Sequence, residues 1–398
     1  MRYTLRGAGL IDVEAGVLRD HALLVDGERI AAVGPIATLP PDVPQVDLGE
    51  AVLVPGFIDA HTHVTIRPWE GNQHAQLARP AVWQTVRGVA NLRRMLQSGV
   101  TTARIMTEAH DIDFTFRDAI AQGEVEGPRL RVAGAGLSPP GRHGGAVSGV
   151  AGPDALRSAV RERISKGADH IKVFTTGGVS STDTSLEESN YSVDELRAIV
   201  DEASSAGLRV AAHAHGGAGV DLAVEAGITS IEHGALLSEE NLTRMHEAGT
   251  WLVLTNTILF HPTGIEQGDG AEPAILAKVQ QARASMARVA TAVREAGIPV
   301  AVGTDSMHGL FAYELEWMVA HGWAPAEALR AATSGGARLL GIESDSGRLA
   351  PGMRADVVAL ARDPLSDITA AADVVAVYKA GTQYRGACST PRAASATA

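Results

Sequence analysis

Apolar and polar positions follow one rhythm near both ends of the chain and another in its middle. Residues 1–50 and 346–384 alternate apolar and polar residues around glycine and aspartate, a pattern typical of half-buried strands. Because strand-like ends flank a different middle, we predict a small β-sandwich domain built from both termini, residues 1–52 and 346–385. Residues 386–398 are small and polar, which predicts a disordered tail.

The middle alternates short apolar runs with amphipathic helical stretches. The strand candidates are AVLVPGFIDAH (51–61), VTTARIM (100–106), RLRVAGAG (129–136), HIKVFTT (170–176), LRVAAHAH (208–215), TSIEHG (229–234), WLVLTN (251–256) and PVAVGTD (299–305). Ser192 and Glu195 predict a capping box at the start of a helix that Gly207 ends. This alternation predicts an α/β fold, a (β/α)8 TIM barrel over residues 53–345. The alternative is an open doubly wound sheet, which would normally carry a glycine-rich phosphate loop that this sequence lacks.

Composition narrows the class of protein. The 398 residues suffice for a barrel of about 250 residues and a smaller domain. A formal net charge of -12 disfavours nucleic acid or an anionic membrane as a partner. The single cysteine, Cys388, excludes an intramolecular disulfide and a cysteine-ligated metal site. Asp12 and Glu14 precede any sustained apolar stretch, so we expect no signal peptide, no membrane span and a cytoplasmic location.

Potential metal ligands fall at the ends of the strand candidates. They are His61 and His63 on the first, Lys172 on the fourth, His213 and His215 on the fifth, His233 on the sixth and Asp305 on the eighth. In a parallel barrel the C-terminal ends of all strands open on one face, where catalysis occurs. A single histidine that closes an apolar strand is more often a hydrogen-bonded core residue than a ligand. Repetition at so many strand ends favours one shared metal site.

The spacing of these residues suits metal chemistry. Alternate residues on a strand point to the same side, so His61 and His63 can bind one ion while Thr62 points away. Imidazole and carboxylate are ligands for Zn²⁺, and also for Mn²⁺, Fe²⁺ or Co²⁺. Lys172 fits only if it is neutral, or if CO₂ has added to give a carbamate that bridges two metals. The other interpretation of Lys172 is a salt-bridge partner near the end of its strand.

Several segments resemble, in order, the motifs of the amidohydrolase superfamily. These segments are VPGFIDAHTHV, VTTAR, HIKVFTTGGV, VAAHAHG, SIEHG, VGTDS and LAPGMRADVVAL, and the resemblance runs from about residue 5 to residue 384. The subgroup that it indicates contains prolidase-like dipeptidases, arginine-releasing carboxypeptidases and ochratoxin amidases, for which HIKVFTTGGVSS and VAAHAHGGAGVDLAVEAGITSIEHG are hallmarks.

The resemblance implies a binuclear centre with two divalent metal ions per chain, zinc foremost. The implied ligands are His61 and His63 for the more buried metal, carbamylated Lys172 as the bridge, His213 and His233 for the other metal, and Asp305 as both a ligand and a proton shuttle.

Three further residues are candidates for contact with substrate. In the related motif the first histidine of strand five is the ligand, which favours His213 and leaves His215 to touch substrate. A histidine in the glycine-rich loop after strand three holds the substrate in that subgroup, and His143 matches it. Arg142 stands where glycine is more usual, and it either adds a cation for an anionic substrate or points outward.

The implied reaction is hydrolysis of an amide bond in a small-molecule substrate, namely an N-acyl amino acid, a dipeptide or a related amide or carbamate. A hydroxide formed from a water that bridges both metals would attack the carbonyl. Asp305 would take the proton and deliver it to the leaving amine. The loop at 256–273 is a lid or specificity loop, or else an ordinary connection. Trp69, His74 and Trp83 either line the pocket or pack helices.

Two other functions compete with this one. A mononuclear deaminase or cyclic-amide hydrolase, such as an imidazolonepropionase-like enzyme, would lack the strand-four lysine and carry a glutamate soon after the strand-five histidine. Lys172 and the segment HAHGGAG disfavour that function. A non-catalytic scaffold would have lost ligands, and none is missing from the sequence. Barrels of this kind often form homo-oligomers, and no stretch of the sequence specifies an interface.

Overall fold

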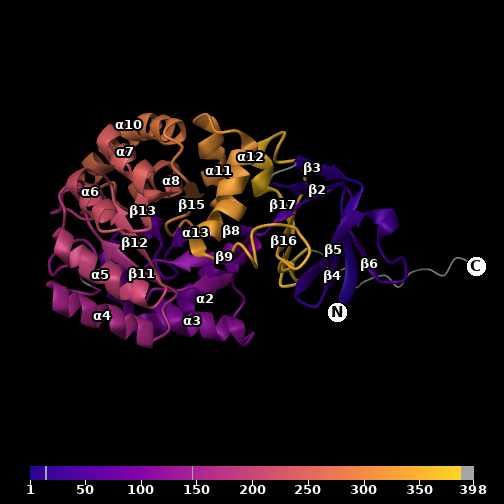
Figure 1. Ribbon diagram of the computed structural model, residues 1–398, viewed down its shortest axis with the longest axis horizontal. Coiled ribbons are helices and arrows are strands. Elements are labelled where there is room, and N and C mark those ends of the chain that lie inside the picture. Colours follow the sequence, from indigo (N-terminus) through magenta and orange to yellow (C-terminus); the bar gives the residue numbers. More distant parts are fainter. Residues whose placement is uncertain (14–15, 146, 387–398) are drawn as a thin grey trace, which may run out of the picture. The chain divides into compact units, whose positions relative to one another are not determined.

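Strands from both ends of the chain pair in one sheet, and a second sheet is built from N-terminal strands. The computed structural model describes residues 1–13, 16–145 and 147–386 (Figure 1), so residues 387–398 of the predicted tail lie outside the described residues. The strand orders are β5-β4-β1-β6 and β18-β17-β16-β7-β2-β3. The bounds are β1 Arg2–Arg6, β2 Gly9–Asp12, β3 Gly16–Arg19, β4 His21–Asp26, β5 Arg29–Pro35, β6 Gln45–Asp47, β7 Val52–Pro55, β16 Val357–Leu360, β17 Val374–Lys379 and β18 Thr382–Arg385.

Strand β7 joins the two ends of the chain. It runs parallel to β2 and antiparallel to β16, with Leu53 opposite Leu10 on one side and Ala359 on the other. Strand β7 ends before Gly56. The next strand, β8 (Phe57–Thr62), belongs to a different sheet. The first strand segment predicted from the sequence, 51–61, therefore holds two strands.

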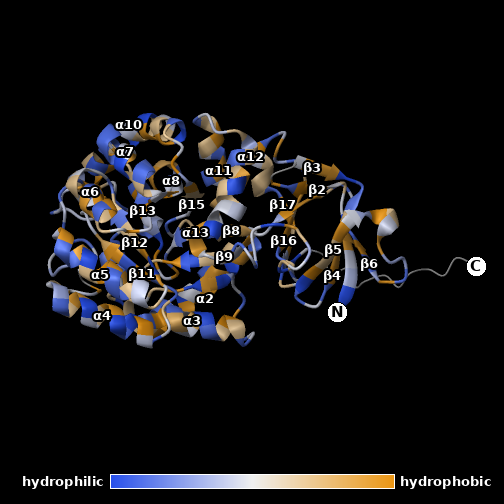
Figure 2. Cartoon of the chain, in the orientation of Figure 1, coloured by the Kyte–Doolittle hydropathy of each residue, from blue (hydrophilic) through white to orange (hydrophobic). Residues whose placement is uncertain are grey.

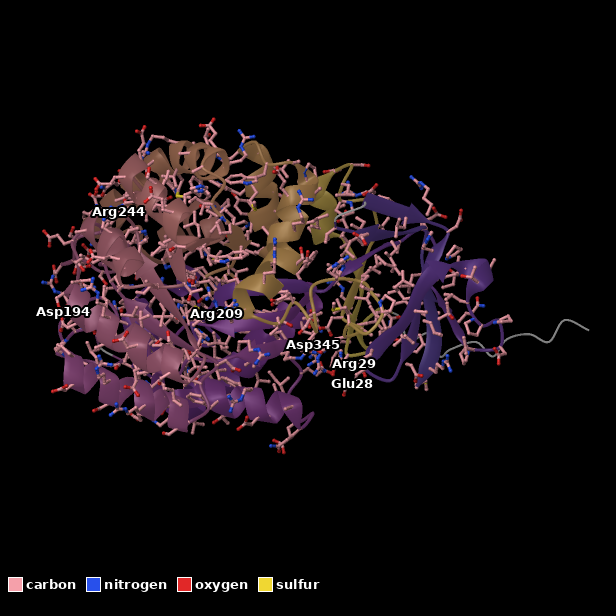
Figure 3. The ribbon with its side chains drawn as sticks, viewed as in Figure 1. Glu28, Arg29, Asp194, Arg209, Arg244 and Asp345 are labelled. Carbon is pink, nitrogen blue, oxygen red and sulfur yellow. The ribbon has the colours of Figure 1, made fainter. Side chains whose placement is uncertain are left out.

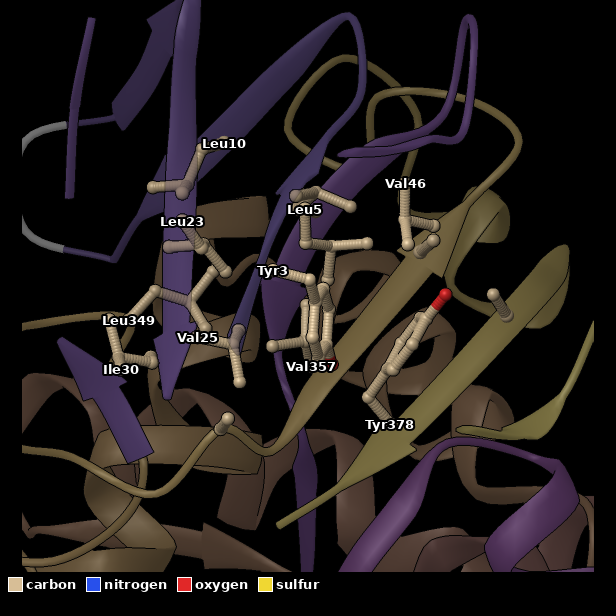
Figure 4. Packing of buried hydrophobic residues seen from close by; sticks show 14 of the residues in the cluster. Tyr3, Leu5, Leu10, Leu23, Val25, Ile30, Val46, Leu349, Val357 and Tyr378 are labelled. Carbon is tan, nitrogen blue, oxygen red and sulfur yellow. The ribbon is translucent and has the colours of Figure 1, made fainter. Parts of the chain in front are cut away.

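Side chains from both of these sheets form one buried hydrophobic cluster (Figure 4). Leu5 on β1, Leu23 and Val25 on β4, and Val357 on β16 belong to it, and each is fully buried. Successive side chains of a strand point to opposite faces. The period of two in the sequence therefore places Leu23 and Val25 on the same face.

A small ionic network ties the turn between β4 and β5 to the segment that precedes β16 (Figure 3). Arg29 Nη2 lies 2.8 Å from Asp345 Oδ1, and Arg354 donates to Asp345 and to Glu28. These side chains are partly exposed to solvent. Such surface pairs contribute about 0–1 kcal/mol each, so the network assists the buried cluster rather than replacing it.

The middle of the chain forms two further sheets. One has the order β10-β9-β8, and the other is a parallel sheet of order β11-β12-β13-β14-β15. The bounds are β8 Phe57–Thr62, β9 Val100–Ile105, β10 Arg129–Arg131, β11 His170–Phe174, β12 Arg209–Ala214, β13 Ser230–His233, β14 Trp251–Leu254 and β15 Val300–Val302. Each strand candidate from the sequence overlaps one of these strands. Backbone contacts join the two sheets at both edges, because Leu137 bridges to Val173 and Asp305 N donates to His61 O at 2.9 Å.

Helices follow most of these strands. Their bounds are α1 Gln73–Leu77, α2 Ala81–Gln97, α3 Ile112–Ala121, α4 Pro153–Ser165, α5 Val193–Ser205, α6 Gly217–Glu225, α7 Glu239–Ala248, α8 Asn256–Phe260, α9 Ile265–Asp269, α10 Pro273–Glu295, α11 Phe311–Ala320, α12 Pro325–Arg330 and α13 Gly336–Leu340. Helices α4 to α7 lie outside β11 to β13 (Figure 1), and apolar positions recur along these helices between hydrophilic ones (Figure 2). The predicted capping box of Ser192 and Glu195 is present at the start of α5.

The chain divides into two compact units. One holds residues 1–59, 93–102 and the chain from Gly309 onwards, and the other holds residues 60–92 and 103–308. The domain boundaries expected from the sequence, at 52/53 and 345/346, remain predictions. Within the residues that the structure describes, no helix combines the length and the apolar character needed to cross a membrane. Every candidate site residue lies in the second unit.

Candidate metal centre

The side chains singled out in the sequence meet in one cavity. The residues His61, His63, His143, Lys172, His213, His215, His233 and Asp305 all line a space of about 60 Å³. All but His143, which lies in the loop between β10 and α4, come from strands or strand ends far apart in the sequence, and His61 and Lys172 are only 1% and 2% exposed. Strand pairing brings them together, because the C-terminal ends of parallel strands lie side by side.

Asp305 lies at the centre of three of these histidines. Its Oδ1 atom is 3.7 Å from Nε2 of His61 and 3.5 Å from Nε2 of His63, and its Oδ2 atom is 3.8 Å from Nδ1 of His233. One ligand atom each from His61, His233 and Asp305 lie within 4.8 Å of one another, a grouping that could hold a metal ion. Nitrogen and carboxylate oxygen are ligands suited to Zn²⁺ and similar ions.

The hydrogen bonds of the two strand-one histidines fix which nitrogen can bind a metal. His61 Nδ1 donates to Glu232 Oε2 at 2.8 Å, and His63 Nδ1 donates to the carbonyl oxygen of Thr107 at 2.9 Å. A ring nitrogen that donates must carry the proton, so the other nitrogen keeps its lone pair. In both residues that other nitrogen, Nε2, is the one near Asp305. Metal-binding histidines in proteins are held in this way.

The strand-five histidines differ in their partners. His213 Nε2 donates to the carbonyl oxygen of Gly177 at 3.1 Å, which leaves Nδ1 as an acceptor. Neither ring nitrogen of His215 has a hydrogen-bond partner among the described residues, although the ring is buried. The ring centroid of His213 lies 4.6 Å from that of His233 and 5.0 Å from that of His215. Both histidines therefore reach the cavity, and only His213 has its tautomer fixed by the protein.

Lys172 is buried. Its Nζ atom has no hydrogen-bond partner in the described part of the chain and lies 5.2 Å from the ring centroid of Phe174. Burial lowers the pKa of Lys172 to about 8, with Arg104 also lowering it and Glu232 and Asp305 raising it. A buried ammonium without a partner is costly. This environment therefore makes the neutral amine of Lys172 more accessible than that of an exposed lysine, and the described residues give its Nζ atom no hydrogen-bonded carboxylate partner.

The pKa values of other candidate ligands follow from burial. Burial lowers the pKa of His63 to about 4 and raises that of Asp305 to about 7, where Lys172 opposes the rise. Neutral imidazole is the form that binds metals. His233 and Asp305 also have positive φ angles, 75° and 47°. Such a backbone is strained for residues with a Cβ, and strain of this kind clusters at functional sites.

His143 lies at the mouth of this group. Its Nδ1 atom is 2.7 Å from Ser181 Oγ, and its ring centroid is 4.6 Å from that of His213. It also lines an outer pocket, together with Arg142 and His74. Arg142 is exposed, so its side chain belongs to the outer pocket and not to the buried cavity.

The segment 256–273 contributes the apolar wall of the cavity. It forms the short helices α8 and α9, whose Ile258, Leu259 and Ile265 are buried and line the cavity. Its glycines permit close approach, because a Cβ on Gly268 would overlap the carbonyl oxygen of Pro68. Of the aromatic residues considered in the sequence, Trp83 is flanked by the guanidinium groups of Arg79 and Arg87.

Sequence reasoning missed the residues that hold the ligands. Glu232 and Arg104 are charged residues inside strands β13 and β9, and both are buried. The position of a charged residue within an apolar strand could have identified both, since such a charge needs a buried partner. Thr107 and Gly177 act through backbone carbonyls, which leave no signal in residue type.

Known proteins resemble this chain over nearly its whole length. The profile of the Amidohydrolase family matches residues 52–384, and that of the NagA composite domain matches residues 14–53. Ochratoxinase of Aspergillus niger is 32% identical over 97% of this chain and 87% of the relative, and its crystal structure superposes with a TM-score of 0.86. At 30% identity, that superposition covers 98% of this chain and 97% of the other.

Two other relatives bear on the chemistry. A prolidase crystallised with N-methylphosphonate-L-proline superposes with a TM-score of 0.88 at 32% identity, covering 97% of this chain and 100% of the other. Imidazolonepropionase of Deinococcus radiodurans is 28% identical over 95% of both chains. With its matched profile and its cavity of histidines, a lysine and an aspartate, this chain belongs to the amidohydrolase family and is a hydrolase of carbon–nitrogen bonds.

Proposed function

We propose that this hydrolase cleaves the amide bond of an N-acyl amino acid, a dipeptide or a related amide or carbamate, at a centre for two divalent metal ions. We further propose that its eight central strands close into a (β/α)8 barrel and that the strands from both ends of the chain form a β-sandwich. The backbone contacts of Leu137 with Val173 and of Asp305 with His61 support closure at both edges. The observation that carries the proposal is the convergence of tautomer-fixed histidines on one cavity with Lys172, whose buried Nζ has no hydrogen-bond partner among the described residues.

The close grouping of His61, His233 and Asp305, with His63 and His213 lining the same cavity, supports our proposal of two metal ions. His61 and His63 would hold one ion, His213 and His233 the other, and Asp305 would bind through a carboxylate oxygen. Metal ions bound here, zinc in our proposal, would supply a water nucleophile at neutral pH and polarise the scissile carbonyl.

Lys172 would serve as the bridge after reaction with CO₂. Its neutral Nζ forms a bond to the carbon of CO₂, and the resulting carbamic acid loses its proton to solvent and becomes an anion. The carbamate of Lys172 would then supply two oxygen donors for metal ions. Burial that favours the neutral amine also favours this addition.

Asp305 would move the proton. Its carboxylate faces His61, His63 and His233, which would hold the metal ions in our proposal. It takes the proton from the attacking water and delivers it to the leaving nitrogen, which departs as an amine. His143 and His215 would orient the substrate by hydrogen bonds, since both line the cavity.

The wall of the cavity indicates which groups lie beside the scissile bond. Phe174, Ile258, Leu259 and Ile265 present apolar side chains to the space in front of the ligands. Burying apolar surface is favourable, and a charged group there would lose its hydration. We therefore propose a substrate with an apolar group next to the amide.

Assay of the purified, zinc-loaded protein against a substrate panel tests this function. The panel contains N-acyl amino acids with apolar side chains, dipeptides that include Xaa-Pro, aryl amides and carbamates, and a cyclic amide related to imidazolonepropionate. We expect release of amine from the open-chain amides. Turnover of the cyclic amide alone would contradict the proposal and favour the function of the imidazolonepropionase relative.

A further inference from the structure

A buried ion pair contacts His61, one of the candidate metal ligands. Glu232 on β13 is fully buried and Arg104 on β9 is 4% exposed. Nη2 of Arg104 donates to both carboxylate oxygens of Glu232, at 2.8 and 3.0 Å. Arg104 Nε also donates to the carbonyl oxygen of Ala60 at 2.6 Å, which ties the arginine to the strand that carries His61.

The carboxylate of Glu232 is held on every side. Ser230 Oγ donates to Oε1 at 2.6 Å, and the same hydroxyl accepts from Arg104 Nη1 at 3.2 Å. Oε2 accepts from His61 Nδ1 at 2.8 Å. Because both oxygens accept hydrogen bonds, the carboxylate of Glu232 has little freedom to rotate. The imidazole of His61, which donates to it, is restricted in the same way.

Stability alone is a weak reason for this arrangement. Removing two charges from water costs about as much as their attraction returns, so a buried pair adds little to the free energy of unfolding. The pair also makes one contact that an isolated Arg–Glu pair would not need, namely the bond to His61. That bond leaves His61 Nε2 unprotonated and 3.7 Å from Asp305 Oδ1.

We propose that Glu232, held in place by Arg104 and Ser230, is a positioning residue that fixes the tautomer and orientation of His61 and thereby sets the affinity of the site for metal. This inference rests on the metal centre proposed above. A carboxylate that accepts from the outer nitrogen of a metal-binding histidine raises the basicity of the inner one, and loss of such a partner typically weakens metal binding about 10- to 100-fold. Arg104 offsets the charge of Glu232 and keeps it directed at His61.

Zinc affinity of the full-length protein, measured by competition with a chelator, tests the inference, and the thermal midpoint of the metal-free protein is the second readout. We expect Glu232→Gln to weaken zinc binding about 10- to 100-fold. It should also lower the thermal midpoint, because Arg104 becomes an unpaired buried cation. The double variant Arg104→Met/Glu232→Gln removes both charges, so its midpoint should return toward wild type while its zinc affinity stays low.

The control is an exposed Arg–Glu pair that makes no contact with a candidate ligand. Arg161 donates to both oxygens of Glu202 between α4 and α5, at 2.7 and 2.8 Å. Glu202→Gln should leave zinc affinity unchanged. If zinc affinity returns with the thermal midpoint in the double variant, or if Glu232→Gln binds zinc as wild type does, the pair is structural only and the inference is wrong. Failure of the wild-type protein itself to bind zinc would instead overturn the proposed centre.

Discussion

Oδ1 of Asp305 lies 3.5 Å from Nε2 of His63, although His63 follows β8 and Asp305 follows β15, far along the sequence. The hydrogen bond from Asp305 N to His61 O fixes this approach, and so does the positive φ angle of Asp305. His63 in turn is held by the carbonyl oxygen of Thr107. Backbone hydrogen bonds therefore orient both the carboxylate and the imidazole, and such orientation is the preorganisation that catalysis requires.

Replacement of Asp305 by asparagine tests its role as proton shuttle. The amide keeps the shape of the side chain but cannot accept a proton at neutral pH. We expect the turnover number to fall about 100- to 10,000-fold, with metal content largely retained. Steady-state kinetics and metal analysis on the same preparation measure both. Turnover that stays at the wild-type level would remove Asp305 from the mechanism.

Ser181→Ala tests how His143 is held. The substitution removes the hydroxyl 2.7 Å from His143 Nδ1. Loss of one such hydrogen bond is worth about 1 kcal/mol, or roughly fivefold in an equilibrium constant. We expect KM to rise by about that factor while metal content stays constant. Ser165→Ala, which removes an exposed hydroxyl bonded to Glu162 O, is the control. An unchanged KM would mean that Ser181 does not position His143 for substrate.

Leu259→Ala tests the apolar wall. Leu259 is buried on α8 and lines the cavity. Removing its side chain should lower kcat/KM about tenfold for amides with a large apolar group, because a few methylene contacts are worth about 1–3 kcal/mol. Substrates with a small group in that position should be much less affected. Equal losses for both classes would show that Leu259 supports the fold and not specificity.

The buried carboxyl of Asp113 predicts how the stability of the fold depends on pH. Burial raises the pKa of this carboxyl from 3.8 to about 6, against the hydrogen bond from Gly134 N. A group whose pKa is higher in the folded state stabilises the fold below its unfolded pKa. That contribution is lost as pH rises from about 4 through about 6.

Asp113→Asn should abolish this pH dependence. At pH 7.5 the metal-free variant should be more stable than wild type by up to about 3 kcal/mol, since one pKa unit corresponds to about 1.4 kcal/mol. At pH 4 the difference should shrink. Urea unfolding of both proteins at the two pH values measures it. A variant that is less stable than wild type at pH 7.5 would contradict the assignment.

The sequence contained the information for the central strands and for the residues at their ends. Periodicity located the strand segments, and alternation placed His61 and His63 on one side. Periodicity did not show that Gly56 divides the first segment, because β7 and β8 read as one apolar run and only pairing separates them.

Other features depend on contacts between distant segments. His213 and His215 lie on the same face of their strand. They differ because His213 donates a hydrogen bond to the carbonyl oxygen of Gly177. Helices α8 and α9 are short, and isolated helices of this length are unstable in water. Packing of Ile258 and Ile265 into the cavity wall accounts for their order, which a glycine-rich segment does not reveal.

The most direct test of the central claim is the metal content of the freshly purified protein, produced with zinc and bicarbonate supplied. Lys172→Ala is the variant, and Lys166→Ala is the control, because Lys166 makes only surface ion pairs with Asp111 and Glu162. We predict about two metal ions per chain in wild type and control, and a sharp fall in Lys172→Ala. About one ion per chain, unchanged in Lys172→Ala, would contradict the bridging role of Lys172 and the binuclear centre with it.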